Sequence, residues 1–398
     1  MEKEISTPPT PINFADTQTA FAYKTNGELN SSYWLFKLIN NPSLVKVSTT
    51  LAQLAFKWHL PVTPLVKHTI YNQFCSGESL QSSLPVIARL NKYGVKSLLD
   101  YGVEGLETET DFDKTVQQLL RSIEFARTNP AVPAISTKIS GFARFALLEK
   151  VSGNITLSTN EQTEWEYVWQ RMHQLCKAAR DAKISIYFDA EESWIQPAID
   201  LLVNTMMEEY NHGFPFAFTT LQMYRHDRLD FLKQLYADAK SKGFLAAVKL
   251  VRGAYMEKER ARAKELGYPS PIQADKAASD KDFNLALQYS IEHIDGVAVC
   301  NASHNEDSAA YLCQVMQQNG VTPNHPNVWF AQLYGMGDHI SFNLAKAGYN
   351  VAKYLPYGPV REVIPYLIRR SQENTSVTGQ MSRELGLILQ EKKRRKTS

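Results

Sequence analysis

The segment VREVIPYLIRRSQENTSV, residues 360–377, carries the most specific chemical pattern in the sequence. Its apolar residues recur at helical spacing, and on such a helix Tyr366, Arg369, Arg370 and Glu373 share one face. Adjacent guanidinium groups repel unless an anion lies beside them, and the planar fork of arginine matches a carboxylate. This face predicts a carboxylate site, while spacing alone leaves open that both arginines are surface residues paired with nearby glutamates.

A second segment, AAVKLVRGAYMEKERARAKELG, joins a basic strand end to a charged helix. Lys249 and Arg252 precede Gly253, which permits a tight turn, and Tyr255 follows at the same edge. Cations there would offset negative charge on a reduced flavin ring. The open alternative is a strand end with no role in binding.

A third segment, FDAEESW, places Asp189 and Glu191 at the end of a strand candidate. Paired acids suggest general acid–base catalysis or a site for a hard metal ion. No HxH, HExxH or DxDxDG pattern accompanies them, so we expect no metal. We expect Asp189 instead to pair with a cation such as Lys138, in PAISTKISG.

The elements that must position these residues alternate between short apolar runs and longer amphipathic stretches. Repeated strand–helix alternation requires a parallel sheet, and eight units fit a barrel of roughly 300 residues. A doubly wound open sheet is the alternative. The eight strand candidates are KSLLDYG (96–102), PAISTKISG (133–141), ISIYFDAE (184–191), FAFTTLQMY (216–224), LAAVKLVRG (245–253), GVAVCNASH (296–304), NVWFAQLYG (327–335) and NVAKYLPYG (350–358).

Polar residues collect where these strands end, which in a barrel is the rim that carries catalytic groups. Because most units contribute at least one such residue, the pattern favours an enzyme. No GxGxxG, GxxxxGK[ST] or GxSxG motif is present, so the barrel itself must hold any flavin. The rim residues are Lys138, Asp189, Glu191, Gln222, Tyr224, Arg252, Tyr255, His304, Gln332, Tyr354 and Tyr357.

The length of 398 residues fits one large domain with an appendage. We expect an N-terminal arm and helical cap over residues 1–65, a catalytic barrel over 66–380 and a basic tail over 381–398. A formal net charge of +2 gives no case for nucleic-acid binding. The four scattered cysteines are typical of reduced thiols.

No signal peptide, transit peptide or long apolar stretch is evident, and we therefore expect a cytoplasmic protein. The basic run Lys392, Lys393, Arg394, Arg395 and Lys396 has two interpretations. One is a solvated, frayed tail; the other is a peripheral contact with anionic lipid on the inner face of the membrane.

Together these segments resemble the proline dehydrogenase family, including the dehydrogenase part of bifunctional proline-utilisation enzymes. The resemblance implies a distorted (βα)8 barrel with the last helix over its mouth and non-covalent FAD at the strand ends. It implies oxidation of L-proline to Δ1-pyrroline-5-carboxylate by hydride transfer from C5 to flavin N5, with electrons passed to a quinone. It spans residues 68–377 and rests on QFCSGE, LDYGVEG, STKISG, FDAEESW, LQMYRHD, KLVRGAYM, SHNED, QLYGMGD and KYLPYGPVREVIPYLIRRSQENTS.

The resemblance also implies residue roles. Lys138, Arg369 and Arg370 would bind the carboxylate, and Asp189 would hold Lys138. Glu104 would pair with Arg369 and close the site. The implied substrate site comprises Lys138, Asp189, Leu250, Tyr255, Tyr354, Tyr366, Arg369 and Arg370. The implied cofactor site comprises Gln222, Lys249, Arg252, Gly253, His304, Asn305, Gln332 and Glu373.

Three positions depart from the pattern of the bacterial bifunctional enzymes. Lys249 stands where an arginine is usual, Met256 where a tryptophan is usual, and Asp275 where a basic residue is expected. The last change makes the local FAD contact doubtful. In this family a tyrosine at the position of Tyr354 leaves little room for a ring hydroxyl, which predicts preference for proline over hydroxyproline.

The rival activities are hydroxyproline dehydrogenase, another flavin barrel such as methylenetetrahydrofolate reductase, and a Schiff-base aldolase that uses Lys138. A regulatory protein that keeps the barrel without turnover is the rival outside enzymes, and the set Lys138, Tyr354, Arg369 and Arg370 argues against it.

Overall fold

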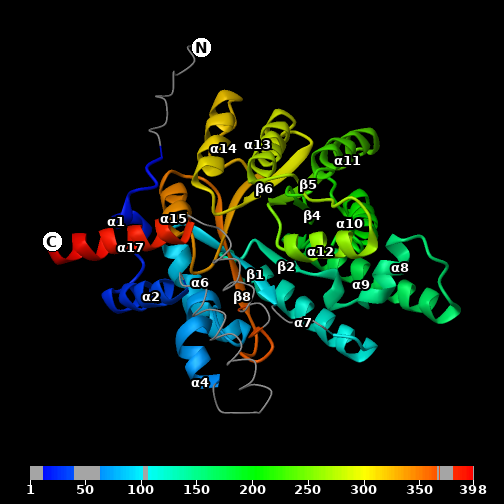
Figure 1. The fold of residues 1–398 in the computed structure, drawn as a ribbon, viewed down its shortest axis with the longest axis horizontal. Helices are drawn as coiled ribbons and strands as arrows, with labels where there is room; N and C mark the ends of the chain where they lie inside the picture. Colours follow the sequence, from blue (N-terminus) through cyan, green and yellow to red (C-terminus); the bar gives the residue numbers. More distant parts are fainter. Residues whose placement is uncertain (1–11, 40–62, 102–105, 365–366, 368–379, 398) are drawn as a thin grey trace.

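The computed structural model describes residues 12–39, 63–101, 106–364, 367 and 380–397. Its centre is a closed barrel in which eight strands follow one another in chain order and all neighbours run parallel (Figure 1). The predicted barrel is confirmed and the open sheet is excluded. The strands are β1 (Val95–Tyr101), β2 (Ala134–Thr137), β3 (Ser185–Phe188), β4 (Ala217–Gln222), β5 (Ala246–Val251), β6 (Val297–Ala302), β7 (Val328–Leu333) and β8 (Val351–Tyr357).

Helices surround the barrel (Figure 1) because each crossover must return the chain to the start of the next parallel strand. Strands covered on both faces are buried throughout, as in AFTTLQ of β4. The helix expected after β8 falls mostly on residues 365–379, of which the structure describes only Leu367. The crossover helices are α7 (Glu109–Arg127), α8 (Phe145–Ser152), α9 (Thr159–Ala182), α10 (Gln196–Tyr210), α11 (Arg228–Lys242), α12 (Met256–Leu266), α13 (Lys276–Glu292), α14 (Glu306–Gln318) and α15 (Asp338–Lys346), with the 3-10 turn η2 (Ile139–Gly141).

Several of the crossover helices, among them α7 and α9, begin with a side-chain cap. Ser158 caps α9 with a capping box: its hydroxyl accepts from the backbone amide of Glu161, and its own amide donates to the Glu161 carboxylate. Thr108 caps α7 in the same position without the return bond. These caps place the helix starts after the loops at the barrel rim, where the polar residues lie.

The N-terminal region packs beside the barrel and precedes its first strand. The elements are α1 (Thr17–Ala20), α2 (Asn26–Ile39), α4 (Thr63–Val66), the π-helix η1 (Lys67–Tyr71), α5 (Asn72–Phe74) and α6 (Leu80–Lys92). Part of the expected helical cap, residues 40–62, lies outside the described residues.

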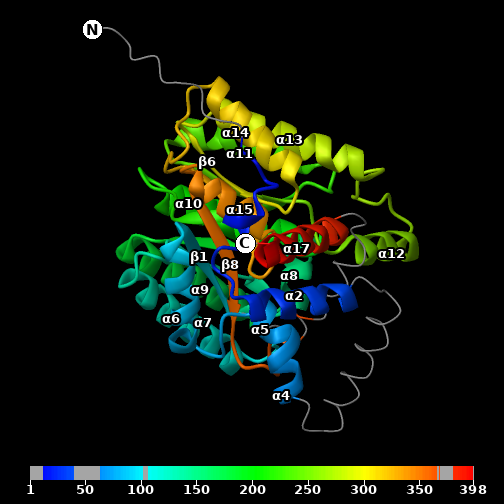
Figure 2. The ribbon, with the colours of Figure 1, turned by 90° about the vertical axis from the view of Figure 1, so that its left-hand side faces the viewer.

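The C-terminal segment expected as a basic tail forms the helix α17 (Gln380–Thr397), which packs against α2 and α1 (Figures 1 and 2). Arg395 donates to the carbonyl oxygens of Phe21 and Lys24 at 2.8 and 3.0 Å, and Arg394 pairs with Glu391 at 2.8 Å. Arg395, together with Lys392, which donates to Asn30 at 2.7 Å, therefore fastens this helix to the N-terminal region.

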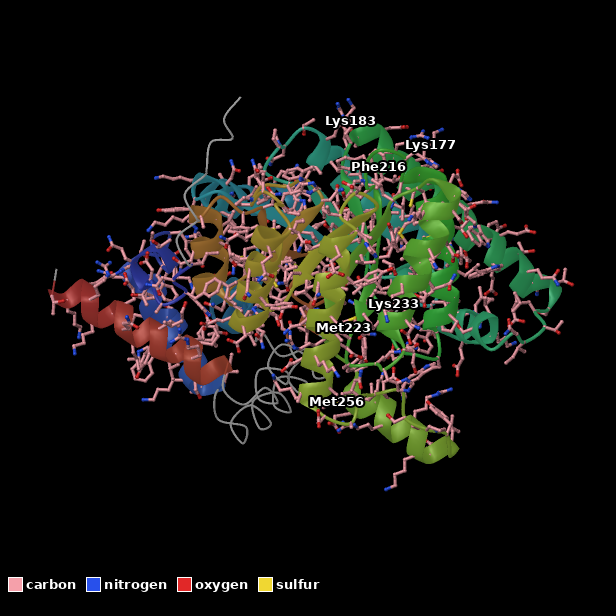
Figure 3. The ribbon with its side chains drawn as sticks, turned by 90° about the horizontal axis from the view of Figure 1, so that it is seen from above. Lys177, Lys183, Phe216, Met223, Lys233 and Met256 are labelled. Carbon is pink, nitrogen blue, oxygen red and sulfur yellow. The ribbon has the colours of Figure 1, made fainter. Side chains whose placement is uncertain are left out.

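Three further findings bear on the sequence predictions. All four cysteines are buried and free of disulfides, as expected of reduced thiols. None of the helices in the described ranges is long and apolar enough to span a membrane. Figure 3 shows α12 standing out from the barrel, with Met256 at its first turn.

Candidate active site

Four strands bring a polar cluster together inside the barrel mouth. Lys249 of β5 forms an ion pair with Oδ1 of Asp189, which follows β3. The hydroxyl of Tyr354, from β8, donates to Oδ2 of Asp189 at 2.8 Å. Ser136 of β2 donates to Oδ1 at 2.9 Å, and Lys138 Nζ lies 4.0 Å from Oδ2. We call Asp189, Lys249, Lys138 and Tyr354 the mouth cluster.

The electrostatics of the mouth cluster favour an ionised aspartate and a neutral tyrosine. Burial by itself would raise the pKa of Asp189, but the charges of Lys249 and Lys138 and two hydrogen bonds hold it below its ordinary value. Burial, together with the charges of Asp100 and Asp189, holds the pKa of Tyr354 well above its usual range. Tyr354 therefore acts as a fixed hydrogen-bond donor.

The sequence predicted that Asp189 holds Lys138, and the structure adds Lys249 as the closer partner. The Lys249 ammonium also lies 5.2 Å from the ring centre of Tyr354, a cation–π distance. Ser136, which sequence reasoning missed, is fully buried and lies 2.9 Å from the Tyr354 hydroxyl. The only signal for it was its place two residues before Lys138 in a strand, where alternate side chains share a face.

Two other members of the predicted substrate site have clear positions. Leu250 is fully buried in the hydrophobic core, and Tyr255 is partly exposed at the N-terminus of α12. Their contacts with a substrate ring stay predictions.

Arg252 lies beside the mouth with its guanidinium already engaged. It pairs with Asp280 at 2.6 Å and donates to the hydroxyls of Ser303 and Ser308 at 2.7 and 3.1 Å. These bonds orient a cation whose side chain remains 23% exposed. Part of this oriented cation therefore faces solvent at the rim.

Gln222 is the last residue of β4, and Gln332 lies in β7. Both side-chain amides are buried, and each donates a hydrogen bond to a backbone carbonyl. Gln222 donates to the carbonyl of Glu191 at 2.7 Å. Gln332 donates to the carbonyl of Ser303 at 3.0 Å and accepts from Ser341 at 2.8 Å.

His304 and Asn305 follow β6. The amide of Leu333 donates to Nε2 of His304 at 3.4 Å. Asn305 caps α14 by accepting from the amide of Ser308 at 2.9 Å. Capping explains an asparagine at this position, and its role toward a cofactor stays a prediction.

Gly253 must be glycine for two reasons. Its φ of +132° lies in a region that side chains disfavour, and a Cβ would lie 2.5 Å from the ring of Tyr224. The exposed backbone of this turn therefore lies open at the rim, next to Arg252.

Glu191 was noted with Asp189 but not assigned to the site. It is buried, and it accepts hydrogen bonds from the amide of Ser140 at 3.1 Å and from the Ser140 hydroxyl. Burial raises its pKa to about 7, against the opposing effect of Ser140 and the charge of Lys138. This carboxyl can exchange a proton near neutral pH.

Five predicted site residues lie outside the described residues: Glu104, Tyr366, Arg369, Arg370 and Glu373. Their roles in the carboxylate site, the gate and the cofactor site stay predictions. Within the described ranges, no group of three or more His, Cys, Asp or Glu side chains could hold a metal ion.

Comparison with known proteins gives related sequences over most of the chain. It is 35% identical over 81% of its length to the carbapenem antibiotics biosynthesis protein CarD of Pectobacterium carotovorum, of which it covers 83%. It is 30% identical over 96% of its length to the mitochondrial proline dehydrogenase 1 of Dictyostelium discoideum, of which it covers 74%. It is 29% identical over 96% of its length to the hydroxyproline dehydrogenase of Xenopus laevis, of which it covers 90%.

The fold is shared with the crystal structure of proline utilization A from Bdellovibrio bacteriovorus inactivated by N-propargylglycine. The TM-score is 0.73 at 19% identity, with 94% of this chain and 40% of that chain covered. The family model for proline dehydrogenase matches residues 83–383, which include every strand of the barrel and the whole mouth cluster. This chain belongs to the proline dehydrogenase family.

Proposed function

We propose that this chain oxidises L-proline to Δ1-pyrroline-5-carboxylate with non-covalently bound FAD and passes the electrons to a quinone. The observation that carries the proposal is the mouth cluster. It joins an ionised aspartate, two lysines and a fixed tyrosine at the mouth of a barrel that the proline dehydrogenase family model matches.

The charges of the mouth cluster suit an anionic group. Lys249 and Lys138 both face Asp189, so the cluster brings two cations to the part of the barrel where a carboxylate would bind. Lys138 is the partner at the longer distance, 4.0 Å, and its side chain is 19% exposed. In this proposal Arg369 and Arg370 complete the clamp.

Tyr354 supports proline over hydroxyproline as the substrate. Its hydroxyl is bound to Asp189 at 2.8 Å, so the ring cannot swing aside to admit a ring hydroxyl without breaking that bond. The hydroxyproline dehydrogenase of Xenopus laevis favours the alternative, because that relative covers 96% of this chain. We expect kcat/KM to be clearly higher for proline; comparable values for the two substrates would contradict the role of Tyr354.

The residues at the ends of β4 to β7 fit a flavin dinucleotide. Lys249 and Arg252 supply positive charge, Gln222 and Gln332 supply amides, and Gly253 leaves the backbone open. When bound, FAD accepts the hydride that leaves C5 of proline. The substrate amine must lose its proton first, so we expect the rate to rise with pH.

The test of the proposal is the carboxylate clamp itself. Arg369→Met and Arg370→Met should each raise KM for proline by well over tenfold, since a charged contact contributes about 1.5–3 kcal/mol. Steady-state oxidation of proline with an artificial quinone acceptor, with Δ1-pyrroline-5-carboxylate quantified as product, measures the effect. An unchanged KM in both variants would contradict the assignment.

A further inference from the structure

The loop between β7 and α15, residues 334–337, lies beside two predicted cofactor residues. Gln332 is the second-last residue of the strand before it, and His304 accepts from the amide of Leu333, the last residue of that strand, at 3.4 Å. Gly337 in this loop has φ of +61°, and a Cβ there would lie 2.7 Å from Nδ1 of His304. The shape of the loop therefore sets the position of both side chains.

The C-terminal helix α17 fastens one end of this loop. The amide of Gly337 donates to Oε2 of Glu384 at 3.0 Å, and the Glu384 side chain is 8% exposed. One residue earlier, Arg383 pairs with Glu306 of α14 at 2.8 Å. Figure 2 shows α17 beside α15, on the side of the barrel where α2 also lies.

The N-terminal region fastens the same end through Asp338, the first residue of α15. Tyr23 donates to Asp338 at 2.7 Å, and Lys24 and Lys353 pair with it at 3.2 and 2.9 Å. Asp338 and Lys353 are fully buried. Burial alone would raise the pKa of Asp338, but the charge of Lys353 and the other contacts hold it well below the ordinary value. We call these four residues the Asp338 cluster.

A third attachment fixes the middle of the loop. Gln73 of α5 donates to the carbonyl of Gly335 at 2.7 Å, and a Cβ at Gly335 would lie 1.9 Å from the Gln73 carbonyl oxygen. Ser32 of α2 donates to the Gln73 side chain at 3.0 Å. Elements outside the strand–helix repeat thus hold the loop at its middle and at its end.

We propose that the two ends of the chain, through Glu384 of α17 and Tyr23 before α2, hold this loop in the shape that binds the cofactor. Glu384 and Tyr23 are then positioning residues for the flavin site, although both lie outside the barrel. Holding a binding loop in its bound shape strengthens binding because less ordering remains to be done when the ligand arrives. The inference rests on the proposed function in taking FAD as the ligand.

The experiment uses the full chain and two conservative variants, Glu384→Gln and Tyr23→Phe. Glu384→Gln replaces a charged acceptor with a neutral one, and Tyr23→Phe removes a single donor while the stacking of the ring on Phe342 at 4.5 Å remains. Glu292→Gln, at the exposed C-terminal end of α13, is the matched control. Circular dichroism first establishes that all four proteins are folded.

Three readouts follow, and the first two do not depend on turnover. In FAD-free protein, amide hydrogen exchange should be faster at residues 334–337 in both variants than in wild type or Glu292→Gln. In titrations followed by flavin fluorescence, the Kd for FAD should rise about tenfold in Glu384→Gln and several-fold in Tyr23→Phe. At saturating FAD, KM for proline should stay at the wild-type value, because the mouth cluster is untouched.

The outcomes separate the two proposals. If wild type binds FAD and both variants match it in Kd and in exchange, the positioning role is overturned and the proposed function stands. If KM for proline at saturating FAD shifts as much as Kd, a general loss of structure explains the variants and the positioning role is overturned. If wild type binds no FAD, both the proposed function and the positioning role are overturned.

Discussion

The mouth cluster and the Asp338 cluster are built from the same residue types, one aspartate, two lysines and one tyrosine, yet they differ in geometry. In the Asp338 cluster every partner lies within 3.2 Å of the carboxylate, and Asp338 and Lys353 are fully buried. In the mouth cluster Lys138 stays 4.0 Å away, and Asp189 is 16% exposed. The same four residue types therefore form a fully buried structural cluster at Asp338 and a partly exposed cluster at the barrel mouth that a ligand can approach.

The difference follows from position in the barrel. The Asp338 cluster fills the space between β8, α15 and the N-terminal region, where the side chains of Asp338 and Lys353 have no exposed surface and an unpaired charge would be costly. In the mouth cluster, Lys138 and Asp189 follow the ends of β2 and β3, and there the two side chains are 4.0 Å apart. A closed cluster should therefore govern stability, and an open one should govern substrate binding.

The largest effect is expected for Asp338→Asn, which removes the buried carboxylate that pairs with both Lys353 and Lys24. Removing one partner of a buried ion pair costs about 3–5 kcal/mol of unfolding free energy. Urea unfolding of the variant and of wild type measures it. A loss below about 1 kcal/mol, the range of surface pairs, would show that the cluster is not closed.

Glu191 extends the comparison, because it is a buried acid beside the mouth cluster. Its hydrogen bonds from Ser140 and the charge of Lys138 lower its pKa by less than burial raises it. Its pKa is raised to about 7, so the folded state binds its proton more tightly than the unfolded state does. Stability should therefore fall as pH rises from about 4.5 to about 7, by on the order of 1–3 kcal/mol. Unfolding of Glu191→Gln should lack this fall between pH 5 and pH 7, and an equal fall in both proteins would contradict it.

Asp189→Asn is the counterpart of Asp338→Asn and should act chiefly on binding. Loss of the aspartate removes the carboxylate that holds Lys249 and Lys138 in place. KM for proline should therefore rise by about tenfold, as for the loss of one charged contact. The unfolding free energy should drop less than in Asp338→Asn. If the two variants lost equal stability and KM were unchanged, the division between the clusters would be wrong.

Tyr354→Phe should give the smallest effect, since one neutral donor is removed and the ring stays. A hydrogen bond to a charged acceptor corresponds to about 1.5–3 kcal/mol at most, and partial solvation of Asp189 reduces that. We expect a several-fold rise in KM for proline and weaker discrimination against hydroxyproline, because the ring is no longer held by the bond to Asp189; both substrates are measured. Unchanged discrimination would mean that the packing of the ring, and not its bond to Asp189, excludes the larger substrate.

The sequence predicted the barrel well because its units repeat the same local pattern, a buried strand run followed by an amphipathic helical stretch. The rim was predictable for a related reason, since the carboxyl ends of parallel strands must meet at one edge. That rule placed Asp189, Lys138 and Tyr354 together before any contact was known.

The pairings within the rim were harder to predict. Lys249 of β5 reaches Asp189 across the one strand between them, β4, and the register of β3, β4 and β5 makes that contact possible. The Asp338 cluster joins Tyr23 to a residue 315 positions later, a distance at which no periodicity carries information. The sequence predicted a tail at the basic end of the chain. Arg395 there binds the backbone carbonyl oxygens of Phe21 and Lys24, and a pattern of side chains does not reveal backbone acceptors.

The most direct test of the proposed chemistry is the absorbance spectrum of the purified protein as L-proline is added without oxygen. The proposed function predicts a yellow protein whose flavin band bleaches on addition of proline. A colourless protein that binds no added FAD, or a flavin band that proline leaves unchanged, would contradict it.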